Sequence, residues 1–296
     1  MGSDSKYLID YIIKLAYPNK NIIWKKTNKS SIIVKSNFEI TEPSWNIYDK
    51  PYIYWSGESY NTNDLLKKNP KSITILSATN KHDDISNDNI YHIPYCCLKF
   101  NYKLPLRRFS NLNNKKLLGY CNSNPIKIRE KLVTLIAEKA NSNEVFALGK
   151  CVGYSKKIIK KKINGIHSDD NMIKEYSNYK FVIAMENKID NGYITEKIIN
   201  AFTSGAIPIY WGDPVIAKNI FNENAFICVN NFNSLEDCAE YIIQLNNDEY
   251  KLNKMKNEPI FKNNIIPDVF QIGNFDNPPQ IYKQMADKIK KIIDNN

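Results

Sequence analysis

Apolar residues form short runs separated by polar turns, and the spacing within each run predicts its secondary structure. KYLIDYIIKLAY places Leu8, Ile12 and Leu15 at the spacing of one helix face. Four runs rich in β-branched and aromatic residues follow: SIIVKS, YIYWSG, SITILSA and IYHIPY. Such runs, bounded by polar turns, are typical of short strands. Residues 1 to about 110 therefore predict a first α/β unit.

A second α/β pattern begins at Leu117. LLGYC and VFALGK predict strands, and a helix is expected over 129–140 between them. Later in the chain, AFICVN predicts a strand, and Ser234 opens the helix SLEDCAEYIIQL. The charged, Asn-rich segment from Arg107 to Lys116 separates the two patterns and is the predicted boundary between them.

The final segment, PPQIYKQMADKIKKIIDNN, predicts an amphipathic helix that begins at Pro278 or Pro279. Its apolar face would consist of Ile281, Met285, Ile289 and Ile292. We expect this helix to pack back on the N-terminal domain, although it could instead lie on a membrane surface. The expected division is a Rossmann-like domain over residues 1–112, another over 113–275, and the closing helix over 276–296.

The most informative stretch is FVIAMENKIDNGYITEKIINAFTSGAIPIYWGDP, residues 181–214. FVIAM is an apolar run expected of a buried parallel strand, and Glu186 and Asn187 come where that strand would end. Gly205 suits the C-terminal end of a helix, and AIPIYW begins a second buried strand. The segment therefore predicts a strand, a loop, a helix and a strand in succession.

Polar residues concentrate at the junction between this loop and the helix. Asn191 and Gly192 form a turn signal, and Thr195 can cap the helix with Glu196 and Lys197 in its first turn. Ligands of open α/β sheets bind at the carboxyl ends of strands, and helix N-termini favour phosphates. The pattern predicts a site for a charged, phosphorylated ligand.

Composition describes an ordinary globular protein, because 43% of the 296 residues are hydrophobic and 24% are charged. A net charge of +10 favours an anionic partner, such as nucleic acid, a sugar nucleotide or a membrane surface, without choosing among them. No apolar run approaches the 18 or so residues of a membrane span, and no secretory signal is evident. We therefore expect a soluble, cytoplasmic protein whose six scattered cysteines are free thiols.

Three elements of the 181–214 stretch closely resemble the signature of the α1,3/4-fucosyltransferases, glycosyltransferase family 10. They are FVIAMEN, GYITEK and PIYWGDP, in the same order as in that family. The resemblance covers roughly residues 50 to 265. The chain looks more like the soluble bacterial or viral members of the family than like its membrane-anchored members. It implies the GT-B fold, an α/β architecture of two Rossmann-like domains facing a cleft. The N-terminal domain would bind the acceptor, and the C-terminal domain would bind the nucleotide sugar.

The resemblance further implies an inverting transfer of fucose from GDP-fucose to a glycan hydroxyl, with α1,3 linkage to GlcNAc expected. Lys197 would then bind the diphosphate, helped by the helix N-terminus. Arg129, in the segment SNPIKIRE, matches the family arginine that binds the diphosphate, and a guanidinium suits phosphate oxygens. Each could instead be an ordinary surface side chain of its helix.

Other positions follow from the same resemblance. Glu196 would lie near the fucose ring and stabilise positive charge in the transition state, or it could only complement the helix dipole. The donor would also be contacted by a further group of residues, each of which could instead be a turn or core residue. That group consists of Asn187, Tyr193, Glu186, Ser123 and Asn124.

Glu58 is the expected general base. YIYWSGESYN places it directly after an apolar strand, and the segment resembles the family's Gly-Glu or Met-Glu-Ser segment, although Tyr60 stands where a proline often follows. The other reading is a solvated turn glutamate. Glu58 and Glu196 are thus the two candidate catalytic residues.

No metal is expected to be required, because Lys197, Arg129 and a helix N-terminus can neutralise a diphosphate. The Asp-rich segments HDDISND and HSDDN look like loops, and His82, His92 and His167 lack ligand spacing, so none receives a catalytic role. The five lysines between Lys156 and Lys162 lie in an expected basic loop over 151–168. That loop is either solvated or in contact with phosphate, an acidic acceptor or a membrane.

Two alternatives remain open at this point. One is a related GT-B transferase with another donor or linkage, which a panel of donors would distinguish. The other is a basic module that binds nucleic acid, supported by the net charge of +10. No helix-turn-helix, zinc pattern or aromatic-basic RNA motif accompanies that charge, so nucleic acid is not an expected partner.

Overall fold

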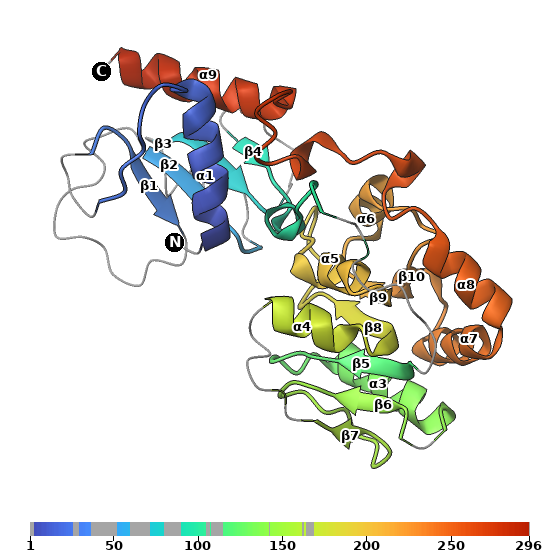
Figure 1. Cartoon of the computed structure of the whole chain (residues 1–296). Helices are drawn as coiled ribbons and strands as arrows, with labels where there is room; N and C mark the ends of the chain where they lie inside the picture. Colours follow the sequence, from blue (N-terminus) through green and yellow to red (C-terminus); the bar gives the residue numbers. More distant parts are fainter. Residues whose placement is uncertain are drawn as a thin grey trace. The chain divides into compact units, whose positions relative to one another are not determined.

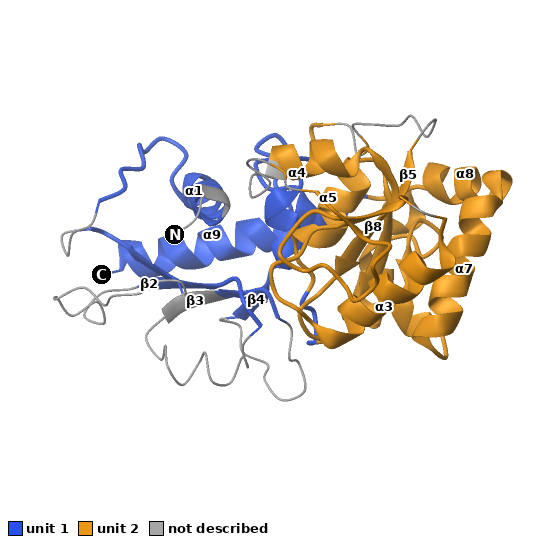
Figure 2. Cartoon of the chain, turned by 90° about the horizontal axis from the view of Figure 1, so that it is seen from below, with its two compact units in different colours: residues 1–102, 190–193, 266–296 blue, residues 103–189, 194–265 orange. Residues whose placement is uncertain are grey.

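The computed structural model describes residues 3–25, 30–36, 52–59, 72–79, 90–104, 107, 115–141, 143–161, 163 and 169–295. Contacts divide the chain into two compact units (Figure 2). Unit 1 comprises residues 1–102, 190–193 and 266–296, and unit 2 comprises 103–189 and 194–265. The expected boundary near residue 112 falls outside the described residues.

Unit 1 contains a parallel four-stranded sheet with the order β1-β2-β3-β4. The strands are β1 (Ile33–Ser36), β2 (Tyr52–Ser56), β3 (Ser72–Ser77) and β4 (Ile90–His92). They coincide with the four runs predicted as strands. Every residue of β2 is buried, as its nearly continuous apolar sequence requires.

Two helices from distant parts of the sequence lie side by side in unit 1, α1 (Ser3–Ala16) and α9 (Gln280–Asp294) (Figure 1). The ring of Tyr11 packs edge-on against Tyr282 with 5.2 Å between centroids, and its hydroxyl donates to the Asn274 carbonyl at 2.8 Å. Pro279 is the N-cap of α9, so the helix begins one residue after it. The short helices η2 (Tyr95–Lys99) and η5 (Asp268–Phe270) also belong to this unit.

Unit 2 contains a parallel six-stranded sheet with the order β10-β9-β8-β5-β6-β7. Its strands are β5 (Lys116–Tyr120), β6 (Val145–Ala147), β7 (Ile159–Lys160), β8 (Tyr179–Met185), β9 (Ile207–Trp211) and β10 (Ile227–Cys228). Two sequence-based expectations were wrong in extent. The expected basic loop contains β7, which pairs with β6, and AFICVN forms only two strand residues before turning into η3 (Val229–Asn231).

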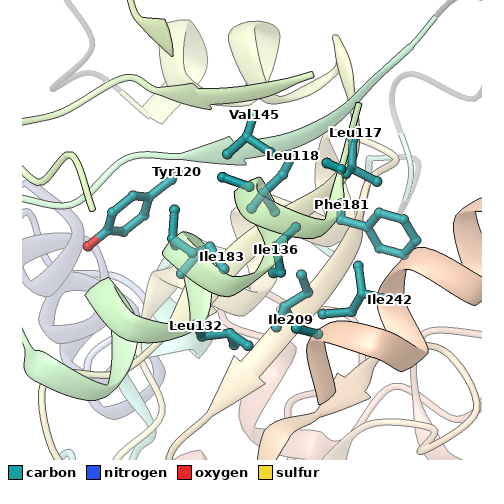
Figure 3. Close-up of a cluster of buried hydrophobic side chains, with 14 of the residues drawn as sticks. Leu117, Leu118, Tyr120, Leu132, Ile136, Val145, Phe181, Ile183, Ile209 and Ile242 are labelled. Carbon is teal, nitrogen blue, oxygen red and sulfur yellow. The ribbon is translucent and has the colours of Figure 1, made fainter. Parts of the chain in front are cut away.

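The helices of unit 2 are α3 (Lys127–Lys139), α4 (Asp169–Tyr176), α5 (Glu196–Thr203), α6 (Pro214–Ile220), α7 (Leu235–Asn247) and α8 (Glu249–Asn257), followed by η4 (Lys262–Asn264). Ser234 caps α7 by accepting from the Asp237 amide, as predicted. Leu118, Ile136, Phe181 and Ile242 meet in the core between sheet and helices (Figure 3). Burying each such side chain contributes about 1.5–3 kcal/mol.

The strand order of unit 2 reverses between β5 and β8. From β5 the chain continues to β6 and β7 on one side, whereas from β8 it continues to β9 and β10 on the other. The loops that follow β5 and β8 therefore diverge at the carboxyl edge of the sheet. Open α/β sheets bind their ligands at such a switch point.

Within the described part of the chain, no helix combines the length and the apolar character that crossing a membrane requires. All six cysteines are free, in agreement with the prediction, and five of them are buried. Unpaired buried cysteines act as small apolar side chains.

A buried carboxylate fastens α3 to its surroundings. Glu130 is 4% exposed and accepts hydrogen bonds from the Gly153 amide at 2.6 Å and from the Tyr120 hydroxyl. Glu130→Gln replaces one acceptor with a donor, so we expect the free energy of unfolding to fall by about 1–3 kcal/mol. Urea denaturation would measure this. Glu138→Gln, at an exposed position of α3, is the control and should change it by less than about 1 kcal/mol.

Candidate functional site

Arg129, in the first turn of α3, reaches across to the turn that follows β8. Its Nη2 donates to the Glu186 carbonyl at 3.0 Å and to Asn187 Oδ1 at 2.9 Å. The side-chain amide of Asn122, just after β5, lies next to Nη1. The guanidinium thus joins the two diverging loops of the switch point.

The Arg129 side chain has no exposed surface, and its Nε has no hydrogen-bond partner among the described residues. Desolvation lowers the pKa of Arg129, although Tyr120, Cys151 and the carboxylates of Glu186 and Glu130 oppose this. Its cationic form would therefore gain from a further anion. A ligand could touch the guanidinium only if a neighbouring group moved, so in this conformation Arg129 acts by holding the Glu186–Asn187 turn.

Glu186 is completely buried and is surrounded by hydrogen-bond donors. The Thr195 amide donates to Oε1 at 2.7 Å, the Thr195 hydroxyl lies 2.8 Å from Oε2, and Lys197 Nζ donates to Oε2 at 3.0 Å. Desolvation raises the pKa of Glu186, while Lys197 and Thr195 oppose the shift. The Thr195 amide and the Lys197 ammonium can only donate, so both carboxyl oxygens of Glu186 accept hydrogen bonds.

Thr195 corrects one sequence-based expectation. It occupies the N-cap position of α5, but its side chain makes no capping hydrogen bond. Its hydroxyl contacts Glu186 instead and accepts from Lys197 Nζ at 2.8 Å. A buried carboxylate needs donors more than an N-terminal amide needs an acceptor, because unpaired buried charge is far more costly.

Lys197 lies at the start of α5 and remains partly open, with 18% of its side chain exposed. Its ammonium group is 3.0 Å from Glu186 Oε2 and 3.8 Å from Glu196 Oε1. Desolvation acts to lower the pKa of Lys197, but the carboxylates of Glu186 and Glu196 outweigh it and raise that pKa overall. A charged lysine at a helix N-terminus can bind an anion.

The PIYWGDP element packs against Glu186. The Trp211 carbonyl accepts from the Glu186 amide at 2.7 Å, and Asp213 caps α6. A Cβ on Gly212 would collide with the Tyr210 hydroxyl and crowd the Glu186 side chain. The glycine therefore allows Glu186 to lie close to the end of β9.

A second group of polar residues lies at the carboxyl edge of the unit 1 sheet. Glu58 and Ser59 follow β2, and His92 ends β4. The hydroxyl of Tyr193, which is 5% exposed, donates to Glu58 Oε2 at 3.1 Å. Tyr193 belongs to the segment Asp190–Tyr193, which packs with unit 1.

The candidate residues thus fall into three groups. Five lie together at the switch point of unit 2: Arg129, Glu186, Asn187, Glu196 and Lys197. Glu58 and Tyr193 meet in unit 1. Ser123 and Asn124 are exposed in the turn after β5.

Sequence reasoning missed the contact of the Thr195 hydroxyl with Glu186 and the contact of His92 with the Gly192 carbonyl. The signal available for His92 was a polar side chain within the predicted strand IYHIPY, which in the structure ends at His92. His82 and His167 lie outside the described residues, as does HDDISND. In the ranges that the structure describes, no three His, Cys, Asp or Glu side chains gather so as to hold a metal ion.

The predicted lysine loop is partly paired with acidic residues. Lys157 lies 3.8 Å from Glu138, and Lys161 lies 2.7 Å from Glu175. These partly exposed ion pairs contribute little stability but reduce the positive charge available to a partner. Lys162 is not among the described residues.

Residues 113–256 match the C-terminal model of glycosyltransferase family 10, the fucosyltransferases. Over these residues, just under half of the chain, it is similar to the fucosyltransferases of family 10. The matched range contains the family 10 switch point, including Arg129 and the GYITEK element. The resemblance stated from the sequence is confirmed.

Several curated relatives are fucosyltransferases by name. A putative fucosyltransferase of Acanthamoeba polyphaga mimivirus is 41% identical over 95 residues, 32% of this chain and 16% of that protein. An α-(1,3)-fucosyltransferase of Helicobacter pylori is 47% identical over 66 residues, 22% and 14% of the two chains. A GDP-fucose protein O-fucosyltransferase 3 of Canis lupus familiaris is 32% identical over 152 residues, 50% and 31%. The chain therefore spans less than a third of each relative's length.

Solved structures support the fold. The crystal structure of an α1,3-fucosyltransferase with GDP aligns with a TM-score of 0.62 at 18% identity, over all of this chain and 88% of the other. A structure of an α1,3-fucosyltransferase with GDP-fucose gives a TM-score of 0.59, over 98% and 97%. Together with the two parallel sheets, these similarities confirm the predicted α/β GT-B class.

Proposed function

We propose that this protein transfers fucose from GDP-fucose to an acceptor hydroxyl with inversion at the anomeric carbon. The observation that carries the proposal is the partly exposed ammonium of Lys197 in the first turn of α5, at the switch point of unit 2. This position suits a diphosphate, because a helix N-terminus and an accessible lysine can both contact an anion. Similarity to family 10 and the names of the relatives support fucose and guanine as the remaining parts of the donor.

The reaction needs a charged leaving group and an activated hydroxyl. As the bond from the anomeric carbon to the diphosphate oxygen breaks, GDP leaves with the electron pair, and Lys197 stabilises the developing charge. The acceptor oxygen forms the new glycosidic bond on the opposite face and gives its proton to Glu58. Glu196, which is partly exposed beside Lys197, would stabilise the positive charge of the sugar ring.

The other candidates have supporting roles in this proposal. Asn187 and Tyr193 would contact the donor, and the exposed Ser123 and Asn124 could bind the nucleotide. Glu186 is buried, so its role is to hold Lys197 and Thr195 in place. Arg129 contributes positive charge and fixes the turn that carries Asn187.

The decisive measurement is GDP release from GDP-fucose in the presence of defined acceptors. We expect release that depends on an acceptor such as N-acetyllactosamine, with mass spectrometry and NMR establishing the linkage, expected to be α1,3 to GlcNAc. A donor panel separates GDP-fucose from other sugar nucleotides. Absence of both GDP binding and turnover would reject the donor assignment.

A protein acceptor is a second candidate, because the canine relative is a GDP-fucose protein O-fucosyltransferase. The same assay should therefore include folded and unfolded protein substrates with accessible serine and threonine hydroxyls. Transfer to protein but not to glycan would replace the proposed glycan acceptor while leaving the donor chemistry unchanged.

We expect turnover to persist in excess EDTA. Lys197, Arg129 and the N-terminus of α5 supply positive charge at the diphosphate without an ion. Rates with EDTA and with added Mn²⁺ should agree within about twofold, less than the tenfold that 1.4 kcal/mol of transition-state stabilisation represents. Strict dependence on the cation would contradict this expectation.

A further inference from the structure

A tight turn of the GYITEK region is fastened to unit 1 by several hydrogen bonds. The turn spans Asp190–Tyr193 and is closed by a hydrogen bond of 3.0 Å from the Tyr193 amide to the Asp190 carbonyl. Gly192 has φ = +75°, a conformation that glycine adopts without strain. The turn therefore has one definite shape, and its orientation depends on what holds it.

Two side chains at the carboxyl edge of the unit 1 sheet hold this turn. His92 Nε2 lies 3.0 Å from the Gly192 carbonyl, and the Ser59 hydroxyl donates to Asp190 Oδ2. A carbonyl oxygen only accepts hydrogen bonds, so His92 must carry its proton on Nε2. The anchors contact the residues on either side of Asn191, which restricts rotation of the turn.

The turn ends at Tyr193, whose hydroxyl donates to Glu58 Oε2. This hydrogen bond fixes one oxygen of the Glu58 carboxylate and thereby the orientation of the other, Oε1. The direction in which Oε1 points depends on Tyr193, and the position of Tyr193 depends on the anchored turn.

We propose that His92 is a positioning residue: by binding the Gly192 carbonyl, it fixes the turn so that Tyr193 orients the Glu58 carboxylate. This inference rests on the proposed function of Glu58 as general base. His92 itself does not touch the reacting atoms in this proposal. It acts through two residues, Gly192 and Tyr193, and it needs only the Nε2 proton.

Three substitutions at one position isolate that proton. His92→Phe keeps a planar aromatic ring and removes the donor. His92→Gln returns an N–H near the position of Nε2, whereas His92→Asn places its amide nearer that of Nδ1. We expect acceptor-dependent kcat to fall about threefold to tenfold in Phe and Asn and to recover in Gln.

Hydrogen–deuterium exchange provides a readout that does not require turnover. The Tyr193 amide is bonded within the turn, so its exchange should accelerate about tenfold in His92→Phe and return towards the wild-type rate in His92→Gln. Unchanged exchange in His92→Phe would overturn the anchoring. Faster exchange with undiminished kcat would overturn the catalytic role of that anchoring.

The two readouts also separate this inference from the proposed function. If the wild-type chain transfers no fucose but the exchange pattern holds, the proposed function fails and the anchor stands. If transfer occurs and all three variants retain full kcat, the fucosyltransferase assignment stands and His92 has no positioning role.

Discussion

Glu58→Gln is expected to lower acceptor-dependent fucose transfer by about 10²–10⁴-fold. Glutamine retains an oxygen that can accept from Tyr193, so the local hydrogen bond survives while the capacity to take a proton is lost. Steady-state kinetics with saturating GDP-fucose would measure the effect. Calorimetric titration should give an unchanged Kd for GDP, because Glu58 belongs to unit 1.

The control for this substitution is Asp287→Asn, which neutralises an exposed carboxylate on α9 of the same unit. It should retain wild-type kcat and kcat/KM. Full transfer activity in Glu58→Gln would show that another group accepts the proton. Loss of GDP binding in that variant would indicate a folding defect and not a missing base.

Lys197→Met is expected to have two separable effects. Removing the ammonium leaves the buried Glu186 without its ionic partner, which should destabilise the chain by about 3–5 kcal/mol. It also removes a charged contact to the proposed diphosphate, so GDP affinity should fall roughly 10- to 100-fold. Urea denaturation and calorimetry measure the two effects independently.

A second substitution separates the loss of stability from the loss of GDP affinity. In Lys197→Met with Glu186→Gln, no unpaired carboxylate remains, so most of the lost stability should return while GDP affinity stays low. Lys127→Met, which alters the exposed first-turn lysine of α3, should change neither quantity appreciably. Recovery of GDP binding in the double variant would mean that Lys197 supports the fold and does not contact the donor.

Local sequence patterns predicted the elements of the 181–214 segment well. The apolar run ended at Met185, and the helix began at Glu196 as expected from its spacing. Gly205 follows the helix with φ = +76°, which explains its place there. The ends of these elements depend on residues only a few positions apart in the sequence. The spacing of apolar residues therefore predicts them directly.

The arrangement of the site depends on contacts that sequence spacing does not contain. Arg129 and Asn187 meet because β5 pairs with β8, and that strand order is a property of the whole sheet. Thr195 had the residue type and position of a cap, but the buried charge of Glu186 redirected its hydroxyl. The contact between His92 and Gly192 spans 100 residues and could not be anticipated from either segment.

The pairing of α1 with α9 has a consequence for the order in which the protein is made. All of unit 2 is synthesised before residues 266–296, so its folding does not depend on them. Unit 1 must wait for α9, whose Tyr282 completes the packing around Tyr11. Until α9 has been synthesised, α1 lacks the helix that packs against it.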